Sequence, residues 1–156
     1  MHTVELLLDD ALEAGVRSLW DRLHAAGLAS LARHRHVTNR PHVTLVSAVS
    51  LAGLPVLPLP LDTVLGPVRL LGRALAREVA DTPALRRLQN DVWQAVGSEH
   101  PHYAPGRWIP HVSLALNVPP DQQKAACALL ADIPPVAGRL IAARSYDTGS
   151  RTVTML

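Results

Sequence analysis

Two short strings in this chain carry the same pair of reactive side chains. The string PHVTL contains His42 and Thr44, and the string PHVSL contains His111 and Ser113. Histidine ionises near neutral pH, so one imidazole can take up a proton while another donates one. Two histidines with two hydroxyls therefore suit in-line attack at a phosphodiester, in which the hydroxyls would bond the non-bridging phosphoryl oxygens.

Each string is expected to place its histidine and hydroxyl on one face of a β-strand. Side chains at positions i and i+2 of a strand point the same way, so the intervening Val and Leu residues would point into apolar packing. If the two polar faces meet, they form a pocket with two imidazoles and two hydroxyls. A single histidine in such a string would indicate little. The evidence for a shared site is that the string occurs twice in matching context.

The elements predicted around the two strings also repeat. From Thr3 to His42 is 39 residues, and from Ala74 to His111 is 37 residues. The two units run in the same order: a strand over 3–8, a helix over 10–27 and the His42 strand; then a strand over 74–80, a helix over 83–97 and the His111 strand. We therefore expect an α+β fold with two pseudo-symmetric lobes, whose antiparallel sheets face a central cleft and whose helices pack on the outside.

The remaining segments are expected to be helix ends, connections and a hairpin. Asp10 with Glu13 resembles a capping box at the start of the first helix. Residues 51–66 hold three prolines and two glycines and indicate an irregular connection or edge. A third helix is predicted from Pro119-Pro120 to about Leu130, and a turn at Thr148-Gly149 indicates a terminal hairpin.

Length and composition bound the class of protein. The 156 residues suit one domain over 1–156, and 48% hydrophobic content is typical of a globular chain. A net charge of +2 suits one or a few phosphates better than a long duplex, and the five aromatic residues argue against a large stacking surface. The single Cys127 excludes an internal disulfide. Without a signal-like or membrane-spanning run, we expect a cytoplasmic monomer.

The two H-x-[T/S] motifs, PHVTL at 41–45 and PHVSL at 110–114, resemble those of the 2H phosphoesterase superfamily. That superfamily includes the 2′-5′ RNA ligase-like proteins and the 2′,3′-cyclic phosphodiesterases. The resemblance implies that His42 and His111 are the catalytic pair and that Thr44 and Ser113 bind phosphate. It also implies that a cyclic phosphate opens with the phosphate left on O2′. His42 as general acid and His111 as general base is the favoured assignment.

The sequence departs from this family at Leu116. In the bacterial RNA ligase-like branch an arginine often stands five residues after the second histidine, where this chain has leucine. Arg40 and Arg107, which precede the two motifs, are candidates to supply that positive charge. Tyr103 and Trp108, in or beside the loop before the second motif, are candidates to stack on a base.

Other histidines have less specific interpretations. The sequence HRH at 34–36 is expected to be a solvated basic loop, because no further metal ligands are evident. The alternative is that this stretch lines the substrate entrance and attracts phosphate. His100 and His102 fall in a surface loop, with a lid as the functional alternative. No metal and no other cofactor is expected, since the two histidines supply both proton transfers.

Three functions remain open from the sequence. The first is a metal-independent phosphodiesterase acting on a 2′,3′-cyclic phosphate or a related cyclic or 2′-5′ phosphodiester, whose partner is an RNA end or a nucleotide. The second is a non-catalytic RNA- or nucleotide-binding module. The third is reversible 2′-5′ RNA ligation in the same pocket. Turnover of a cyclic phosphate would indicate the first function, and retained affinity without turnover would indicate the second. Joined 2′-5′ product would indicate the third.

Overall fold

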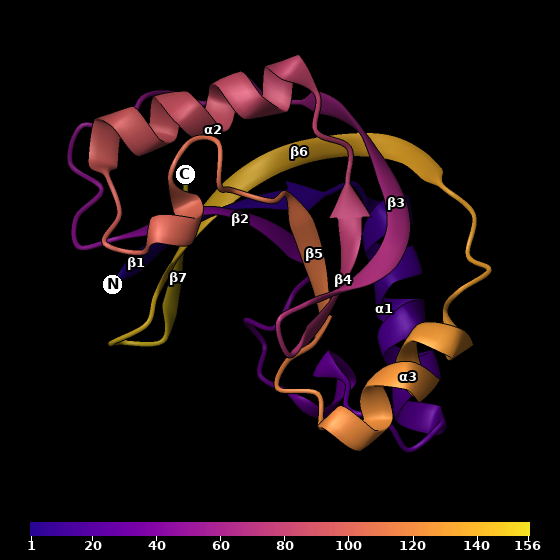
Figure 1. Ribbon diagram of the computed structural model, residues 1–156. Coiled ribbons are helices and arrows are strands. Elements are labelled where there is room, and N and C mark those ends of the chain that lie inside the picture. Colours follow the sequence, from indigo (N-terminus) through magenta and orange to yellow (C-terminus); the bar gives the residue numbers. More distant parts are fainter.

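The computed structural model describes residues 1–156 and places one antiparallel sheet among three α-helices (Figure 1). The predicted α+β class is confirmed. None of the three α-helices combines the length and the apolar character that a membrane span requires. The strands are β1 (His2–Leu8), β2 (His42–Ala48), β3 (Leu61–Leu71), β4 (Ala74–Val79), β5 (His111–Ala115), β6 (Val136–Asp147) and β7 (Thr152–Met155). The helices are α1 (Asp10–Ala25), α2 (Pro83–Val96) and α3 (Pro120–Leu129), with single 3-10 turns at Leu31–Arg33 and Pro101–Tyr103.

All seven strands belong to one sheet, in the order β2-β1-β6-β3-β4-β5, with β7 paired to β6. The sequence predicted separate sheets in two lobes, whereas β3 and β6 hydrogen-bond over Leu61–Leu65 and Val136–Leu140 and so join the halves. The predicted strand–helix–strand units are present as β1-α1-β2 and β4-α2-β5. Their histidine strands, β2 and β5, lie at the two ends of the strand order.

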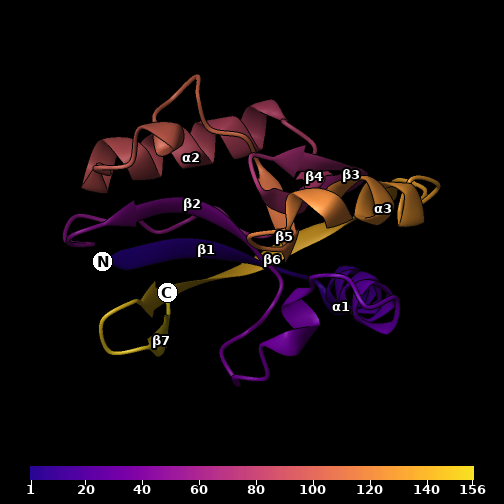
Figure 2. The same ribbon diagram turned by 60° about the horizontal axis from the view of Figure 1, so that its bottom comes forward.

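The helices pack across the two units. Helix α2 contacts β2 of the first unit, α1 contacts β5 of the second unit as well as β1 and β6, and β2 contacts β5 directly. In Figure 2, β1, β2 and β6 run between α2 and α1. Each histidine strand is therefore supported by the helix of the other unit.

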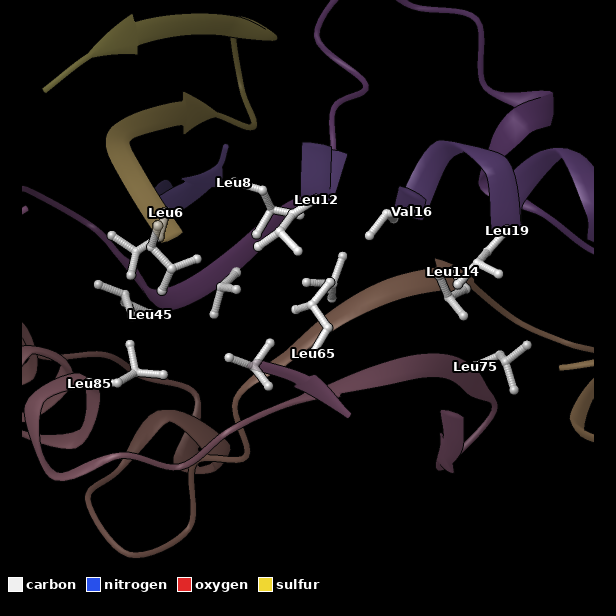
Figure 3. Close-up of a cluster of buried hydrophobic side chains, with 14 of the residues drawn as sticks. Leu6, Leu8, Leu12, Val16, Leu19, Leu45, Leu65, Leu75, Leu85 and Leu114 are labelled. Carbon is white, nitrogen blue, oxygen red and sulfur yellow. The ribbon is translucent and has the colours of Figure 1, made fainter. Parts of the chain in front are cut away.

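The hydrophobic core is continuous across both units. One cluster of buried side chains includes Leu12 from α1, Leu45 from β2, Leu85 from α2 and Leu114 from β5 (Figure 3). Burying such side chains is the main favourable contribution to folding, about 1.5–3 kcal/mol for each large apolar side chain. The two units therefore share one core.

Helix α1 starts at the predicted residue, Asp10, but its N-cap differs from the predicted one. Asp9 is the N-cap, and its carboxylate accepts a hydrogen bond from the backbone N–H of Leu12 at 2.8 Å. The predicted capping box of Asp10 and Glu13 is wrong, because the Glu13 carboxylate instead forms an ion pair with Arg40. At α2 the predicted cap is confirmed, since the Thr82 hydroxyl accepts from the N–H of Leu85.

The predicted connection over residues 51–66 is also partly wrong, because β3 begins at Leu61. Gly66 and Pro67 lie within β3 where its register against β4 shifts between Leu65 and Val68. A bulge leaves ladder groups free, so it tolerates a residue without an N–H. The guanidinium of buried Arg77 bonds the freed carbonyl of Gly66 at 2.9 Å.

Candidate active site

The two repeated strings form the strands β2 and β5 with the predicted alternation. His42 and Thr44 are half-buried on one face of β2, while Val43 and Leu45 are fully buried on the other. In β5, His111 and Ser113 are likewise half-buried between buried apolar residues. The polar faces of both strands are thus accessible, and their apolar faces belong to the core.

The backbone holds both imidazoles in the same way. The Nδ1 atom of His42 lies 2.7 Å from the carbonyl oxygen of Arg40, and the Nδ1 atom of His111 lies 2.7 Å from the carbonyl oxygen of Ile109. A carbonyl oxygen only accepts, so each Nδ1 carries the proton and donates it. In the neutral ring this leaves the lone pair on Nε2, which is the atom free to exchange a proton.

One cavity of about 440 Å³, called here the Ser113 pocket, brings both strings together. Thr44 of β2 lines it with His111 and Ser113 of β5. Its other polar and aromatic walls are His102, Tyr103, Arg107 and Trp108, and Leu116 also lines it. Two phosphate-binding hydroxyls predicted from separate halves therefore face a single space.

His42 lines a second cavity of about 410 Å³, called here the His42 pocket. The two predicted catalytic histidines thus line different cavities, because His111 lines the Ser113 pocket, and the link between the cavities is the shared face of β2 that carries His42 and Thr44. The positive charge of His42 is also one cause that lowers the pKa of His111. The two histidines are therefore close enough to interact electrostatically.

The surroundings of His111 favour its neutral form. Burial lowers the pKa of His111 from the ordinary value, and the hydrogen bond to the Ile109 carbonyl opposes part of that shift. The positive charges of His42, His102 and Arg69 lower the pKa further. A neutral imidazole with a free Nε2 lone pair is the form that acts as a general base.

A buried ion pair lies beside His42 and was missed by the sequence interpretation. The carboxylate of Glu5 is 2.7 Å from Nε of Arg144 and 3.6 Å from Nε2 of His42. Glu5 and Arg144 are only 3% and 5% exposed. The signal in the sequence was weak: one carboxylate in the otherwise apolar strand TVELLL.

The register of the sheet shows how the two halves differ. Glu5 lies between Thr44 on β2 and Arg144 on β6. In the other half, Ala76 lies between Ser113 on β5 and Arg69 on β3. An arginine thus occupies the third strand in each half, but the position opposite the hydroxyl residue is a carboxylate only in the half containing His42. In the other half the carboxylate of β4, Glu78, lies opposite His111 and forms an ion pair with Arg69. A carboxylate attracts a protonated imidazole.

The other predicted site residues separate into two groups. Tyr103, Arg107 and Trp108 line the Ser113 pocket, whereas Arg40 lines neither pocket and forms its ion pair with Glu13. Burial and the charge of Glu5 raise the pKa of Tyr103, so its hydroxyl stays protonated.

Trp108 is almost fully buried and donates its indole N–H to the carbonyl of Thr44 at 3.0 Å. Its polar atom therefore holds the β2 backbone.

The predicted basic loop contributes to the site. His34 and His36 line the His42 pocket, together with Arg151 from the β6–β7 turn. The ring of His102 packs on Tyr103 with centroids 4.3 Å apart at the Ser113 pocket. No group of three His, Cys, Asp or Glu side chains is arranged to hold a metal ion.

Comparison with known proteins gives a family match. The model described as "2′-5′ RNA ligase superfamily" matches residues 58–144, which include the PHVSL string. A search among curated proteins gave no match. The crystal structure of LigT from E. coli in its apo form is similar to this chain, with a TM-score of 0.48 and 18% sequence identity. The similarity covers 99% of this chain and 93% of that chain.

Proposed function

Because the chain belongs to the 2′-5′ RNA ligase superfamily, we propose that it is a phosphodiesterase that hydrolyses a 2′,3′-cyclic phosphate or a related 2′-5′ phosphodiester. The observation that carries the proposal is the matched setting of His42 and His111. Each ring donates Nδ1–H to the carbonyl two residues earlier, keeps Nε2 free and stands beside a hydroxyl on the same strand face.

Different surroundings support different roles for the two histidines. His111 is the general base, because burial and nearby positive charges favour its neutral form. His42 is the general acid, because the Glu5 carboxylate lies 3.6 Å from its Nε2 and attracts the imidazolium. Thr44 and Ser113 hold the non-bridging phosphoryl oxygens, and Arg107 supplies a positive charge at the same pocket.

The proposed reaction is a single in-line displacement. A water oxygen forms a bond to phosphorus while the bond from phosphorus to O3′ breaks. Nε2 of His111 takes the proton of the water, and Nε2 of His42 gives its proton to O3′. The products are a 2′-phosphate monoester and a free 3′-hydroxyl. The two strand–helix–strand units act in this reaction as two pseudo-symmetric lobes, each of which supplies one histidine strand.

The test is hydrolysis of a panel of nucleoside 2′,3′-cyclic phosphates and 2′-5′ dinucleotides, with products identified by phosphorus NMR in the presence of EDTA. We expect His42→Asn and His111→Asn each to lower kcat by about 10²–10⁴-fold, the usual contribution of one general acid or base. His24→Asn is the control, since His24 is exposed on α1 and lines neither pocket.

Equal rates for the parent and both histidine variants would show that the assignment is wrong. No turnover by the parent, with affinity for phosphorylated ends that Thr44→Ala or Ser113→Ala weakens, would instead favour a binding module. Joined 2′-5′ product from cyclic-phosphate and 5′-hydroxyl ends would show that the same pocket runs the reverse reaction.

A further inference from the structure

The proposed reaction uses His42 and Glu5, but most residues that line the His42 pocket have no part in it. This cavity is lined by charged and titratable side chains from three parts of the chain: His34 and His36 before β2, Arg144 and Tyr146 on β6, and Arg151 in the β6–β7 turn. We propose that it is a second anion subsite, which holds a phosphate on the 5′ oxygen of the nucleotide whose cyclic phosphate reacts. This inference rests on the proposed function.

The charge balance of the pocket favours an anion. Two guanidinium groups, Arg144 and Arg151, line it against one carboxylate, Glu5. Glu5 is already paired with Arg144 at 2.7 Å. The exposed side chain of Arg151 forms no ion pair and no hydrogen bond within the chain, so its charge is uncompensated. A guanidinium is well suited to a phosphate because it donates two parallel hydrogen bonds.

The basic loop adds an uncharged hydrogen-bond donor to the lining of the His42 pocket. The Nδ1 atom of His36 accepts a hydrogen bond from the backbone N–H of Thr38 at 3.2 Å and lies 2.7 Å from its hydroxyl. An accepting Nδ1 places the proton of a neutral ring on Nε2. His36 therefore presents an N–H donor even when uncharged, which suits a phosphate oxygen. Tyr146 also lines this pocket, and an aromatic side chain is the type that stacks on a base.

The place of the His42 pocket along β2 suits a second phosphate on the same substrate molecule. His42 lines this pocket, while Thr44, about 7 Å further along the same strand, lines the Ser113 pocket. A substrate whose cyclic phosphate reacts at His42 and His111 would thus have the positively charged lining of the His42 pocket beside its reacting group. A 5′-phosphate or a 5′ phosphodiester has the required chemistry.

The experiment compares three substrates that share the same reacting group. They are adenosine 2′,3′-cyclic phosphate, the same compound with a 5′-phosphate, and the dinucleotide that ends in adenosine 2′,3′-cyclic phosphate. We expect kcat/KM to be about tenfold higher when the 5′ oxygen carries phosphate, as for a charge-assisted hydrogen bond. A preference for both phosphorylated substrates indicates recognition of the phosphate itself, and a preference for the dinucleotide alone assigns the phosphate to an RNA strand.

Two variants test the residues. Arg151→Gln and His34→Gln, both at exposed positions, should bring the ratio of kcat/KM between phosphorylated and unphosphorylated substrates toward one. Arg139→Gln is the matched control, because Arg139 is an exposed arginine on β6 that lines neither pocket. A parent ratio near one, or an Arg151→Gln variant that keeps the parent ratio, would overturn the subsite.

Failure of the proposed function gives a different result. If the parent hydrolyses none of the three substrates, calorimetry compares the binding of adenosine 2′,5′-bisphosphate with that of adenosine 2′-monophosphate. Tighter binding of the bisphosphate, lost in Arg151→Gln, supports the subsite without catalysis. Equal affinities for the two ligands overturn the subsite as well.

Discussion

Single side chains distinguish the two histidines, although the backbone holds both rings alike. His42 has the carboxylate of Glu5 near its Nε2, whereas the matching position in the other half is Ala76. Burial lowers the pKa of His111, and the positive charges around it, among them Arg69, lower this pKa further. At the scale of residues, the burial of His111 and this difference in charge are what support the proposed base and acid roles.

The acidic limb of the pH–rate profile tests the state of His111. Burial lowers the pKa of His111, and a general base acts in its neutral form. The rate should therefore rise with pH through a midpoint below 6.5, the ordinary histidine value, and fall when the pH drops through it. Measuring kcat/KM against pH checks this. A midpoint at or above 6.5 would contradict the proposed environment of the base.

Arg69→Gln removes one of the positive charges that lower the pKa of His111. The midpoint of the acidic limb should therefore move to higher pH. Arg87→Gln, at another exposed arginine, provides the matched control.

The buried ion pair of Glu5 and Arg144 should be important for stability. Glu5→Gln leaves the Arg144 guanidinium buried without its counterion, and removing one partner of such a pair costs about 3–5 kcal/mol. Urea unfolding measures the loss. Glu78→Gln is the control, because the exposed pair of Glu78 and Arg69 should contribute less than about 1 kcal/mol.

The double variant Glu5→Gln with Arg144→Met should lose less stability than the sum of the two single changes, since it leaves no unpaired charge. A Glu5→Gln variant as stable as Glu78→Gln would show that the buried pair has no such role.

At the scale of elements, two indoles hold the histidine strands. Trp20 of α1 donates to the carbonyl of Ser113 at 3.1 Å, and Trp108, just before β5, donates to the carbonyl of Thr44 at 3.0 Å. The two carbonyls belong to β2 and β5, which are the strands at the two ends of the strand order. Backbone groups on the outer side of such an edge strand have no neighbouring strand to bond. Each hydroxyl residue of the site is thus positioned by a tryptophan from the other unit.

Substitution by phenylalanine tests these two bonds. Trp20→Phe and Trp108→Phe should each lower the free energy of unfolding by about 1–3 kcal/mol more than Trp93→Phe, because each leaves a carbonyl without its donor. Trp93 is the control, since its indole nitrogen is buried without any hydrogen-bond partner. Equal losses for all three variants in urea unfolding would contradict a special role for the two bonds.

At the scale of the whole molecule, the two units cannot be separated without exposing the core. Buried residues of both units form one cluster, and β3 and β6 join the halves of the sheet. The helix of each unit covers the histidine strand of the other. The geometry of the site therefore depends on both units being folded.

Unfolding should consequently be one cooperative transition. Leu45→Ala in the first unit and Leu114→Ala in the second should each cost about 2–5 kcal/mol and shift the same transition, because both side chains are fully buried. Tryptophan fluorescence and far-UV circular dichroism should give coincident curves. Val56→Ala, at a side chain 98% exposed, serves as the control. Two separated transitions would show that the units are independent.

The sequence by itself determined the features that depend on local pattern. The alternation of His42 and Thr44 with buried apolar residues follows from the two-residue period of a strand, and the start of α2 follows from Thr82-Pro83. The repeat of strand, helix and histidine strand is likewise visible as spacing along the chain. Local periodicity and capping chemistry require no knowledge of which strands become neighbours.

Only the tertiary structure decided the contacts between distant residues. Glu5 and Arg144 are 139 positions apart, and Arg40 pairs with Glu13 rather than lining either pocket. The two indole bonds also connect residues 93 and 64 positions apart. Such contacts depend on the order and register of the strands in the single sheet. These are set by packing of the whole chain, so a charged residue in a local pattern does not reveal its partner.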